Sequence, residues 1–161
     1  MQIHPAALEQ LPLLLLLYAQ AREFMAQHGN PSQWGTDRPS PEQLRQDILD
    51  HCLFLCMEGS QCAAVFCLRP GPDETYTQIE QGQWLNQQPY GVVHRIISTR
   101  VVSGAAAFCL EYALQQYGNL RIDTHEQNRP MRSLLQKLGF TLCGTIYVQN
   151  GTPRLAYQKC L

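Results

Sequence analysis

The stretch from His94 to Ala107 joins a buried apolar run to a helix start built from small residues. Gly104 is followed by three alanines, and such small side chains let another molecule approach the backbone. The first turn of a helix carries N–H groups without partners inside the helix, and these favour an anion such as a pyrophosphate. The same alanines also suit a helix packed tightly on a sheet, so the sequence leaves both interpretations open.

A second polar cluster follows the short strand expected at residues 120–124. It contains His125, and Asn128 stands where a helix over residues 129–138 is expected to begin. Gly139 and Phe140 then turn the chain back into a strand. Titratable and amide side chains therefore gather at one strand-to-helix junction.

The rest of the pattern predicts a mixed α/β domain with parallel crossovers near its middle. Ser40, Pro41 and Gln43 form a strong helix start, with Gln43 expected to reach back to the N-cap as in a capping box. A long loop is expected over residues 70–89. Helices are expected over residues 6–27, 41–50, 104–117 and 129–138, and strands over 1–4, 52–57, 62–68, 92–97, 120–124, 140–148 and 153–160.

Composition narrows the class of protein. A length of 161 residues favours a single domain, 1–161, and 45% hydrophobic residues are enough for a continuous core. Twelve basic against thirteen acidic residues give a net charge of −1, which argues against a nucleic-acid partner. The seven cysteines lie mostly in apolar runs, which favours a reducing, cytoplasmic setting. They form no C-x2-C pair, so we expect no metal, and His51, Cys52 and Cys56 are a weak candidate for one.

The apolar segment 11–19 could be read as an export signal or as an amphipathic helix of the domain. No Lys or Arg precedes it, and it is shorter than the roughly 20 residues that span a bilayer. The apolar face continues through Phe24 and Met25 at helical spacing. We therefore expect an amphipathic helix and no membrane partner.

The run from Asn128 through Leu134 to Leu138, Gly139 and Phe140 resembles the end of the GNAT superfamily of N-acetyltransferases. The resemblance extends back to the strand at 94–96 and the small-residue helix start, and the order of elements matches along the whole chain. Trp34 and the loop 76–84 resemble a subgroup within this superfamily.

The resemblance implies a central mixed β-sheet splayed into a V between the strands 92–97 and 120–124, flanked by about four helices. Acetyl-CoA would be the co-substrate, with its pantetheine arm in the V and its pyrophosphate on the helix start. The cofactor-binding residues implied in this way are Ile96, Ile97, Ser98, Val101, Val102, Ser103, Gly104, Ala105, Ala106 and Asn128.

Two positions depart from the pattern of the superfamily. Val101 stands where a Gln or Arg usually leads the pyrophosphate turn, and Arg100 is a nearby substitute. Leu135 stands where many members carry the tyrosine that protonates the leaving thiolate. Either another group or water would then supply that proton, and Tyr147 and Tyr157 on the last hairpin are the candidate groups, although most strand tyrosines only pack.

A base is also needed, since acyl transfer to an amine requires the neutral amine. His94, on the strand that borders the V, is the first candidate, and His125 is the second. The alternatives are a hydrogen-bonded core histidine at 94, a turn cap at 125, and deprotonation through ordered water.

The loop 70–89 contains acidic and aromatic residues and no Lys or Arg. Such a lid would suit a cationic amine next to an apolar group, whereas an ordinary solvated loop is the alternative. The substrate-binding residues expected here are Tyr76, Glu80 and Trp84, together with Trp34. The basic residues Arg100, Arg129, Arg132 and Lys137 are expected near the CoA phosphates, or simply on solvated helix faces.

The favoured interpretation is therefore an N-acetyltransferase that moves an acetyl group from acetyl-CoA to a primary amine of a small molecule or peptide by direct attack in a ternary complex. A catalytically weak or inactive acyl-CoA-binding or sensing domain of the same fold is the alternative, and a thiol enzyme is a third. The chain ends in a strand, so a homodimer formed through the last hairpin is also open.

Overall fold

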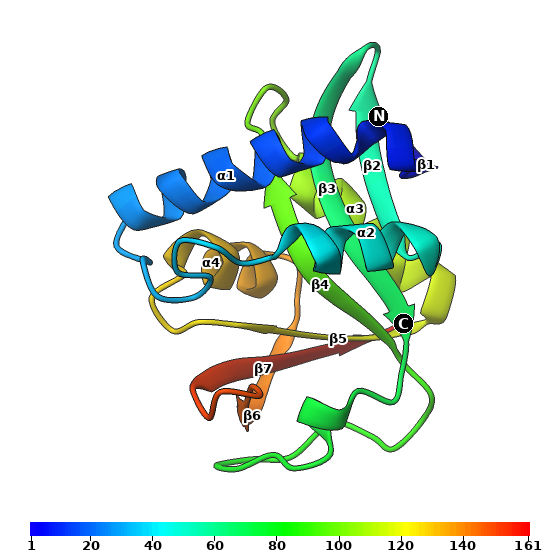
Figure 1. The fold of residues 1–161 in the computed structure, drawn as a ribbon. Helices are drawn as coiled ribbons and strands as arrows, with labels where there is room; N and C mark the ends of the chain where they lie inside the picture. Colours follow the sequence, from blue (N-terminus) through cyan, green and yellow to red (C-terminus); the bar gives the residue numbers. More distant parts are fainter. The chain divides into compact units, whose positions relative to one another are not determined.

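A computed structural model describes all residues from Met1 to Leu161 (Figure 1). Its seven strands form one mixed sheet in the order β1-β2-β3-β4-β5-β7-β6. The elements are β1 (Gln2–Pro5), α1 (Leu11–Gln27), α2 (Pro41–Leu49), β2 (Leu53–Glu58), β3 (Gln61–Pro70), β4 (Gly91–Ser98), α3 (Ala105–Tyr117), β5 (Asn119–Thr124), α4 (Arg129–Lys137), β6 (Thr141–Tyr147) and β7 (Pro153–Cys160), with two 3-10 turns at Leu8–Gln10 and Glu74–Tyr76. The predicted mixed α/β fold with four helices is confirmed.

The chain divides into two compact units, residues 1–68 with 94–110 and residues 69–93 with 111–161. In the first unit β1 and β3 both pair with β2 in antiparallel fashion. Figure 1 shows α1 and α2 lying over β2, β3 and β4. Their inner side chains form one apolar cluster with these strands, made of Leu14, Tyr18, Leu44, Ile48, Cys52, Leu53, Leu55, Val65, Cys67 and Ile97. Ile97, near the end of β4, belongs to this cluster.

The second unit contains the parallel pair of strands that the sequence predicts. Gly91, Val92 and Val93 of β4 pair with residues 120–122 of β5. Strand β7 pairs with β5 on one side and with β6 on the other, both in antiparallel fashion. The edge strand of the last hairpin is therefore β6 rather than the final strand, and a homodimer formed there stays a prediction.

Local signals account for most of the helix boundaries. The Ser40 hydroxyl accepts a hydrogen bond from the Gln43 N–H at 3.1 Å, so the predicted N-cap of α2 is confirmed. The Gln43 side chain differs from the prediction, because its amide donates to Asp47 at 2.9 Å instead of reaching back to the cap. Gly118 has a φ of 68° and follows α3 directly, a left-handed conformation that glycine adopts without strain.

The long loop 70–89 is more ordered than the sequence predicts. It contains the 3-10 turn at Glu74–Tyr76, and Glu80 forms an antiparallel bridge with Thr145 of β6. Its backbone is therefore tied to the sheet of this unit, while most of its residues are exposed, and a role as a lid stays a prediction. Across the whole chain, no helix combines the length and the apolar character that crossing a membrane requires.

Candidate functional site

Strand β4 changes conformation in its middle, at Arg95. The φ of Arg95 is 52°, in the left-handed region that a residue with a side chain rarely adopts. Such a conformation costs about 1–3 kcal/mol and persists only where the surroundings fix it. Arg95 therefore marks a point where the strand is held in an unfavourable geometry by its neighbours.

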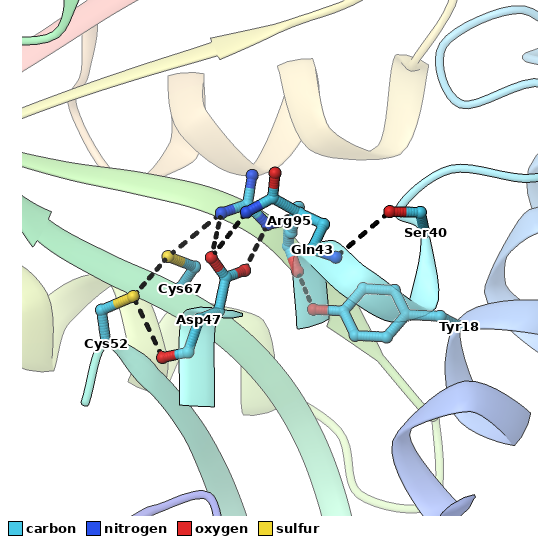
Figure 2. A network of polar contacts seen from close by, with 7 residues as sticks. All are labelled: Tyr18, Ser40, Gln43, Asp47, Cys52, Cys67 and Arg95. Atoms are coloured by element: carbon cyan, nitrogen blue, oxygen red, sulfur yellow. Dashed lines mark hydrogen bonds and ion pairs between the residues drawn. The ribbon is translucent and has the colours of Figure 1, made fainter. Parts of the chain in front are cut away.

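Two helices supply the contacts that fix Arg95 (Figure 2). The Tyr18 hydroxyl of α1 donates to the Arg95 carbonyl oxygen at 2.6 Å. The Arg95 guanidinium forms a fork with the carboxylate of Asp47 on α2, with Nε to Oδ2 at 2.8 Å and Nη2 to Oδ1 at 3.0 Å. Paired donors on one carboxylate are strong and directional. Backbone and side chain of the same residue are thus held from separate helices.

The segment after Arg95 carries the residues expected to contact the pantetheine arm, Ile96, Ile97 and Ser98. Ile97 is buried in the apolar cluster, while Ile96 and Ser98 are half-buried. The turn that follows is anchored to β3, because the Thr99 N–H donates to the Ala63 carbonyl at 3.0 Å. The Arg100 guanidinium lies 3.6 Å from the centre of the Phe24 ring of α1.

The turn at residues 101–104 leads into α3 with its backbone open to solvent. Val101 is 52% exposed, and Ser103 and Gly104 are also exposed. Gly104 has a φ of 81°, and a Cβ built on it would meet no atom within 4 Å. Inside the helix Ala105 is buried and Ala106 is half-buried. The exposed residues of this turn agree with the interpretation as an anion site, and the buried Ala105 agrees with the alternative of tight packing, so both interpretations stay open.

In the second unit, two residues predicted on separate grounds lie together. The Tyr147 hydroxyl donates to the Glu80 carboxylate at 3.0 Å. This hydrogen bond, with the negative charge of Glu80, raises the pKa of Tyr147 above the ordinary tyrosine value. Tyr147 is 44% exposed, so the pair is open to solvent and keeps its phenol protonated near neutral pH.

The two candidate bases lie in different environments. His94 on β4 is half-buried. The Nδ1 atom of His125 accepts the Gln127 N–H at 3.1 Å, and burial together with the charge of Arg154 lowers the pKa of the imidazole. In the neutral ring the proton then lies on Nε2, so the free lone pair is already used in the turn. This is the turn-capping geometry that the sequence left open, and a role for His125 as a base stays a prediction.

Comparison with known proteins decides the family. The scan against protein-family models and the search of curated proteins gave no match. Among solved structures, a GNAT-family acetyltransferase from Streptococcus agalactiae 2603 is 31% identical with a TM-score of 0.88, and the match covers 99% of this chain and 95% of that one. This chain belongs to the GNAT family of acetyltransferases.

More distant GNAT structures share the fold. A GNAT-family acetyltransferase from Listeria monocytogenes 4b F2365 is 22% identical with a TM-score of 0.72, covering 99% of this chain and 94% of that one. The NatB acetyltransferase complex bound to CoA and MES is 14% identical with a TM-score of 0.62, covering 100% of this chain and 99% of that one. Acyl transfer is therefore the general chemistry of this fold and family.

The two positions that depart from the GNAT pattern differ in their surroundings. Leu135 of α4 is fully buried and belongs to the inner face of the helix. Asn128 acts as the N-cap of this helix, since its side-chain oxygen accepts the Met131 N–H at 3.3 Å. Val101 remains solvent-exposed, so its replacement of the usual polar residue leaves the neighbouring backbone accessible.

The aromatic residues expected to contact the substrate are mostly internal. Tyr76 and Trp84 are buried in one cluster with Val92, and the Trp84 indole donates to the Tyr76 carbonyl at 3.0 Å. The Tyr76 hydroxyl donates to Asp123 at 2.6 Å, which fixes the loop to β5. Trp34, in the first unit, is half-buried with its ring 5.8 Å from that of Tyr18. Direct contact of these rings with a substrate stays a prediction, and Glu80 is the accessible member of the set.

One group of side chains in the structure is close enough together to bind a metal ion. The ligand atoms of Asp47, Cys52 and Cys67 lie within 4.8 Å of one another, and all three residues are buried. The Arg95 guanidinium already binds both Asp47 oxygens and contacts the Cys67 sulfur at 3.4 Å. A cation at this place would face a fixed positive charge, so we assign the group to the Arg95 network rather than to a metal.

The buried Arg95–Asp47 pair is the part of the candidate site that sequence reasoning missed. One signal was present, because Asp47 and Ile48 follow Leu44 by three and four residues, which places all three on the inner face of α2. An acidic residue on an apolar helix face needs a buried partner. The sequence did not show which residue this partner is, because Arg95 lies 48 positions away.

Proposed function

We propose that this protein transfers an acetyl group from acetyl-CoA to a primary amine of a small molecule or peptide, by direct attack of the amine in a ternary complex. The proposal depends most on one observation, the exposed turn at 101–104 that opens the 13-residue helix α3. Free N–H groups and the positive end of the helix dipole suit the pyrophosphate of CoA. The CoA named with the NatB complex supports the same class of cofactor.

The residues of this chain would hold the cofactor mainly through the backbone. Ile96, Ile97 and Ser98 would bind the pantetheine arm, the turn from Val101 to Ala106 would bind the pyrophosphate, and Asn128 would contribute from the start of α4. Backbone donors depend little on side-chain identity, which explains how Val101 is tolerated. Acetyl-CoA would supply a thioester whose carbonyl carbon accepts the amine and whose sulfur leaves as a thiolate.

Two groups already described would carry the proton transfers. His94 would accept the proton that the amine must lose, since histidine titrates near neutral pH. Tyr147, whose pKa is raised by Glu80, would remain protonated, and its hydroxyl would have to turn from Glu80 toward the leaving thiolate to donate its proton there. The Glu80 carboxylate would also attract a cationic acceptor to this exposed pair.

Binding of acetyl-CoA is the first test, measured by titration calorimetry with reduced protein and with ATP as the control ligand. Micromolar affinity, about −8 kcal/mol, for acetyl-CoA and CoA but not for ATP supports the site. Gly104→Asp would place a negative charge at the pyrophosphate turn and should weaken CoA binding by at least about tenfold. Gly59→Asp is the matched control, because Gly59 also has a positive φ and open space around its Cβ position.

Transfer is tested next by mass spectrometry of a panel of primary amines incubated with acetyl-CoA. His94→Ala should reduce turnover far more than it weakens cofactor binding, whereas unchanged turnover removes His94 from the mechanism. Tight binding without acetylation of any amine would favour the second candidate, an acyl-CoA-binding or sensing domain. The buried Leu135 at the tyrosine position is the observation that supports this second candidate.

A further inference from the structure

We infer that Tyr18 and Asp47 are positioning residues, which aim the backbone of Ile96, Ile97 and Ser98 at the cofactor by holding Arg95 in its left-handed conformation. This inference rests on the proposed acetyl-CoA site. Neither residue lies in the segments expected to touch the cofactor, and both act through Arg95.

The first step is local geometry. A peptide plane takes its direction from the φ and ψ angles on either side, so the conformation of Arg95 sets where the Ile96 N–H points. An ordinary strand alternates its side chains and its backbone groups, and a left-handed residue interrupts that alternation. The pairing of β4 with β5 covers Gly91, Val92 and Val93, so it ends two residues before Arg95.

The second step is that the left-handed conformation is supported at two independent points. Tyr18 bonds the carbonyl oxygen of Arg95, which belongs to the peptide plane joining Arg95 to Ile96. Asp47 bonds the guanidinium and so fixes the side chain of the same residue. A residue anchored at one point could still rotate about that point. Anchoring both the backbone and the side chain of Arg95 restricts the orientation of the peptide plane between Arg95 and Ile96.

The third step is that both anchors are themselves rigid. Tyr18 is fully buried in the apolar cluster of the first unit, so its hydroxyl has little freedom. Asp47 is fully buried as well and receives the Gln43 amide at 2.9 Å, while the capped start of α2 fixes Gln43 (Figure 2). The Asp47 carbonyl oxygen accepts the Cys52 N–H at 3.0 Å, which joins the end of α2 to the start of β2.

These contacts do more than close the core. A purely structural purpose would be met by an apolar residue at 95 and a regular strand, without the cost of a left-handed arginine and a buried carboxylate. Strained residues that are fixed on several sides are typical of sites where backbone groups meet a ligand. The strain at Arg95 directly precedes the segment proposed to bind the cofactor, which links the network to that site.

Tyr18→Phe is the principal test, since it removes one hydroxyl and leaves the ring packed. We expect CoA affinity in calorimetry to fall by about tenfold, the effect of losing one buried hydrogen bond from the bound geometry. Val65→Ala, in the same apolar cluster, is the matched control for lost stability and should bind CoA as the wild type does. Tyr18→Phe with wild-type affinity but a lowered Tm would overturn the inference and leave the proposed function intact.

Two substitutions at Arg95 give a second, independent test. Arg95→Gly and Arg95→Ala both remove the guanidinium, but only glycine keeps a φ of 52° without steric cost. We expect Arg95→Gly to bind CoA about 5–30-fold more tightly than Arg95→Ala, the range set by the cost of a left-handed residue. Equal affinities of the two variants would refute a role for the backbone conformation. A wild type that binds no CoA would instead overturn the proposed function, and with it this inference.

Discussion

Replacing Asp47 by Asn tests the buried hydrogen-bond network around Arg95, because Asp47 accepts most of the hydrogen bonds in that network. The carboxylate accepts two bonds from Arg95 and one from Gln43, and no part of Asp47 is exposed to solvent. Asparagine has the same size but offers one acceptor oxygen, and its amide group would turn N–H donors toward the guanidinium. The charge of Arg95 would then lack its counter-charge.

The expected loss of stability follows from the burial of the pair. Removing one partner of a buried ion pair costs about 3–5 kcal/mol. The Arg95 side chain retains 19% exposure, so water can relieve part of the unpaired charge, and we expect about 3 kcal/mol. For a domain of this size that free energy lowers the Tm by roughly 6–12 °C. It is a large share of the roughly 5–15 kcal/mol that holds a typical domain folded.

Urea unfolding of the wild type, Asp47→Asn, Arg95→Met and the double variant measures this coupling. The double variant should be destabilised by no more than about 1 kcal/mol beyond either single variant, because it leaves no unpaired buried charge. Asp50→Asn is the control, since Asp50 accepts the Gln46 amide at 2.7 Å on the exposed side of the same helix and should change stability by less than about 0.5 kcal/mol. Single losses that simply add, within about 0.5 kcal/mol, would show that Asp47 and Arg95 act independently and would refute the reasoning.

Three further outcomes are expected. Glu80→Gln should lower the pKa of Tyr147 toward the ordinary tyrosine value, because the hydrogen bond and the charge of Glu80 raise it; an absorbance titration that shows no change would contradict the assignment. His125 should titrate below the ordinary histidine value in NMR, and Arg154→Gln should raise the pKa of His125. Because this pKa is depressed in the folded state, the contribution of His125 to stability is present above about pH 6.5 and is lost as the pH falls. Cys62, whose pKa burial raises to about 11, should resist iodoacetamide at pH 8, where only about 0.1% is thiolate; rapid labelling of Cys62 in peptide mapping, or loss of transfer on labelling, would instead favour a thiol enzyme.

Structural features that depend on residues close together in the sequence could be predicted. The N-cap of α2 at Ser40 and the helix stop at Gly118 both depend on local backbone chemistry, and the structure confirms them. The strand order near the middle of the chain followed from the alternation of strands and helices. The helix start after Gly104 was also predictable from its small residues, whereas its role as a pyrophosphate site stays a prediction.

Features that depend on distant pairs could not be predicted in this way. Tyr76 and Trp84 looked like the aromatic edge of a lid, but the hydrogen bond from Tyr76 to Asp123 joins residues 47 positions apart and draws both rings inward. The sequence showed an acidic loop and no reason for it to fold onto the sheet. The Tyr147–Glu80 pair spans 67 positions and was equally invisible as a pair, although each residue was singled out alone.

The left-handed Arg95 shows why a local rule can fail at the place where function is expected. Arginine has no preference for a positive φ, so that conformation needs support from distant residues, and Tyr18 and Asp47 supply contacts to its backbone and its side chain. The same dependence makes the residue a good reporter, because a change in either anchor is transmitted to the backbone of the next three residues. If the cofactor binds there, the free energy that holds Arg95 in place is part of what prepares the site before the cofactor arrives, and affinity should follow the anchors rather than the side chains that face the ligand.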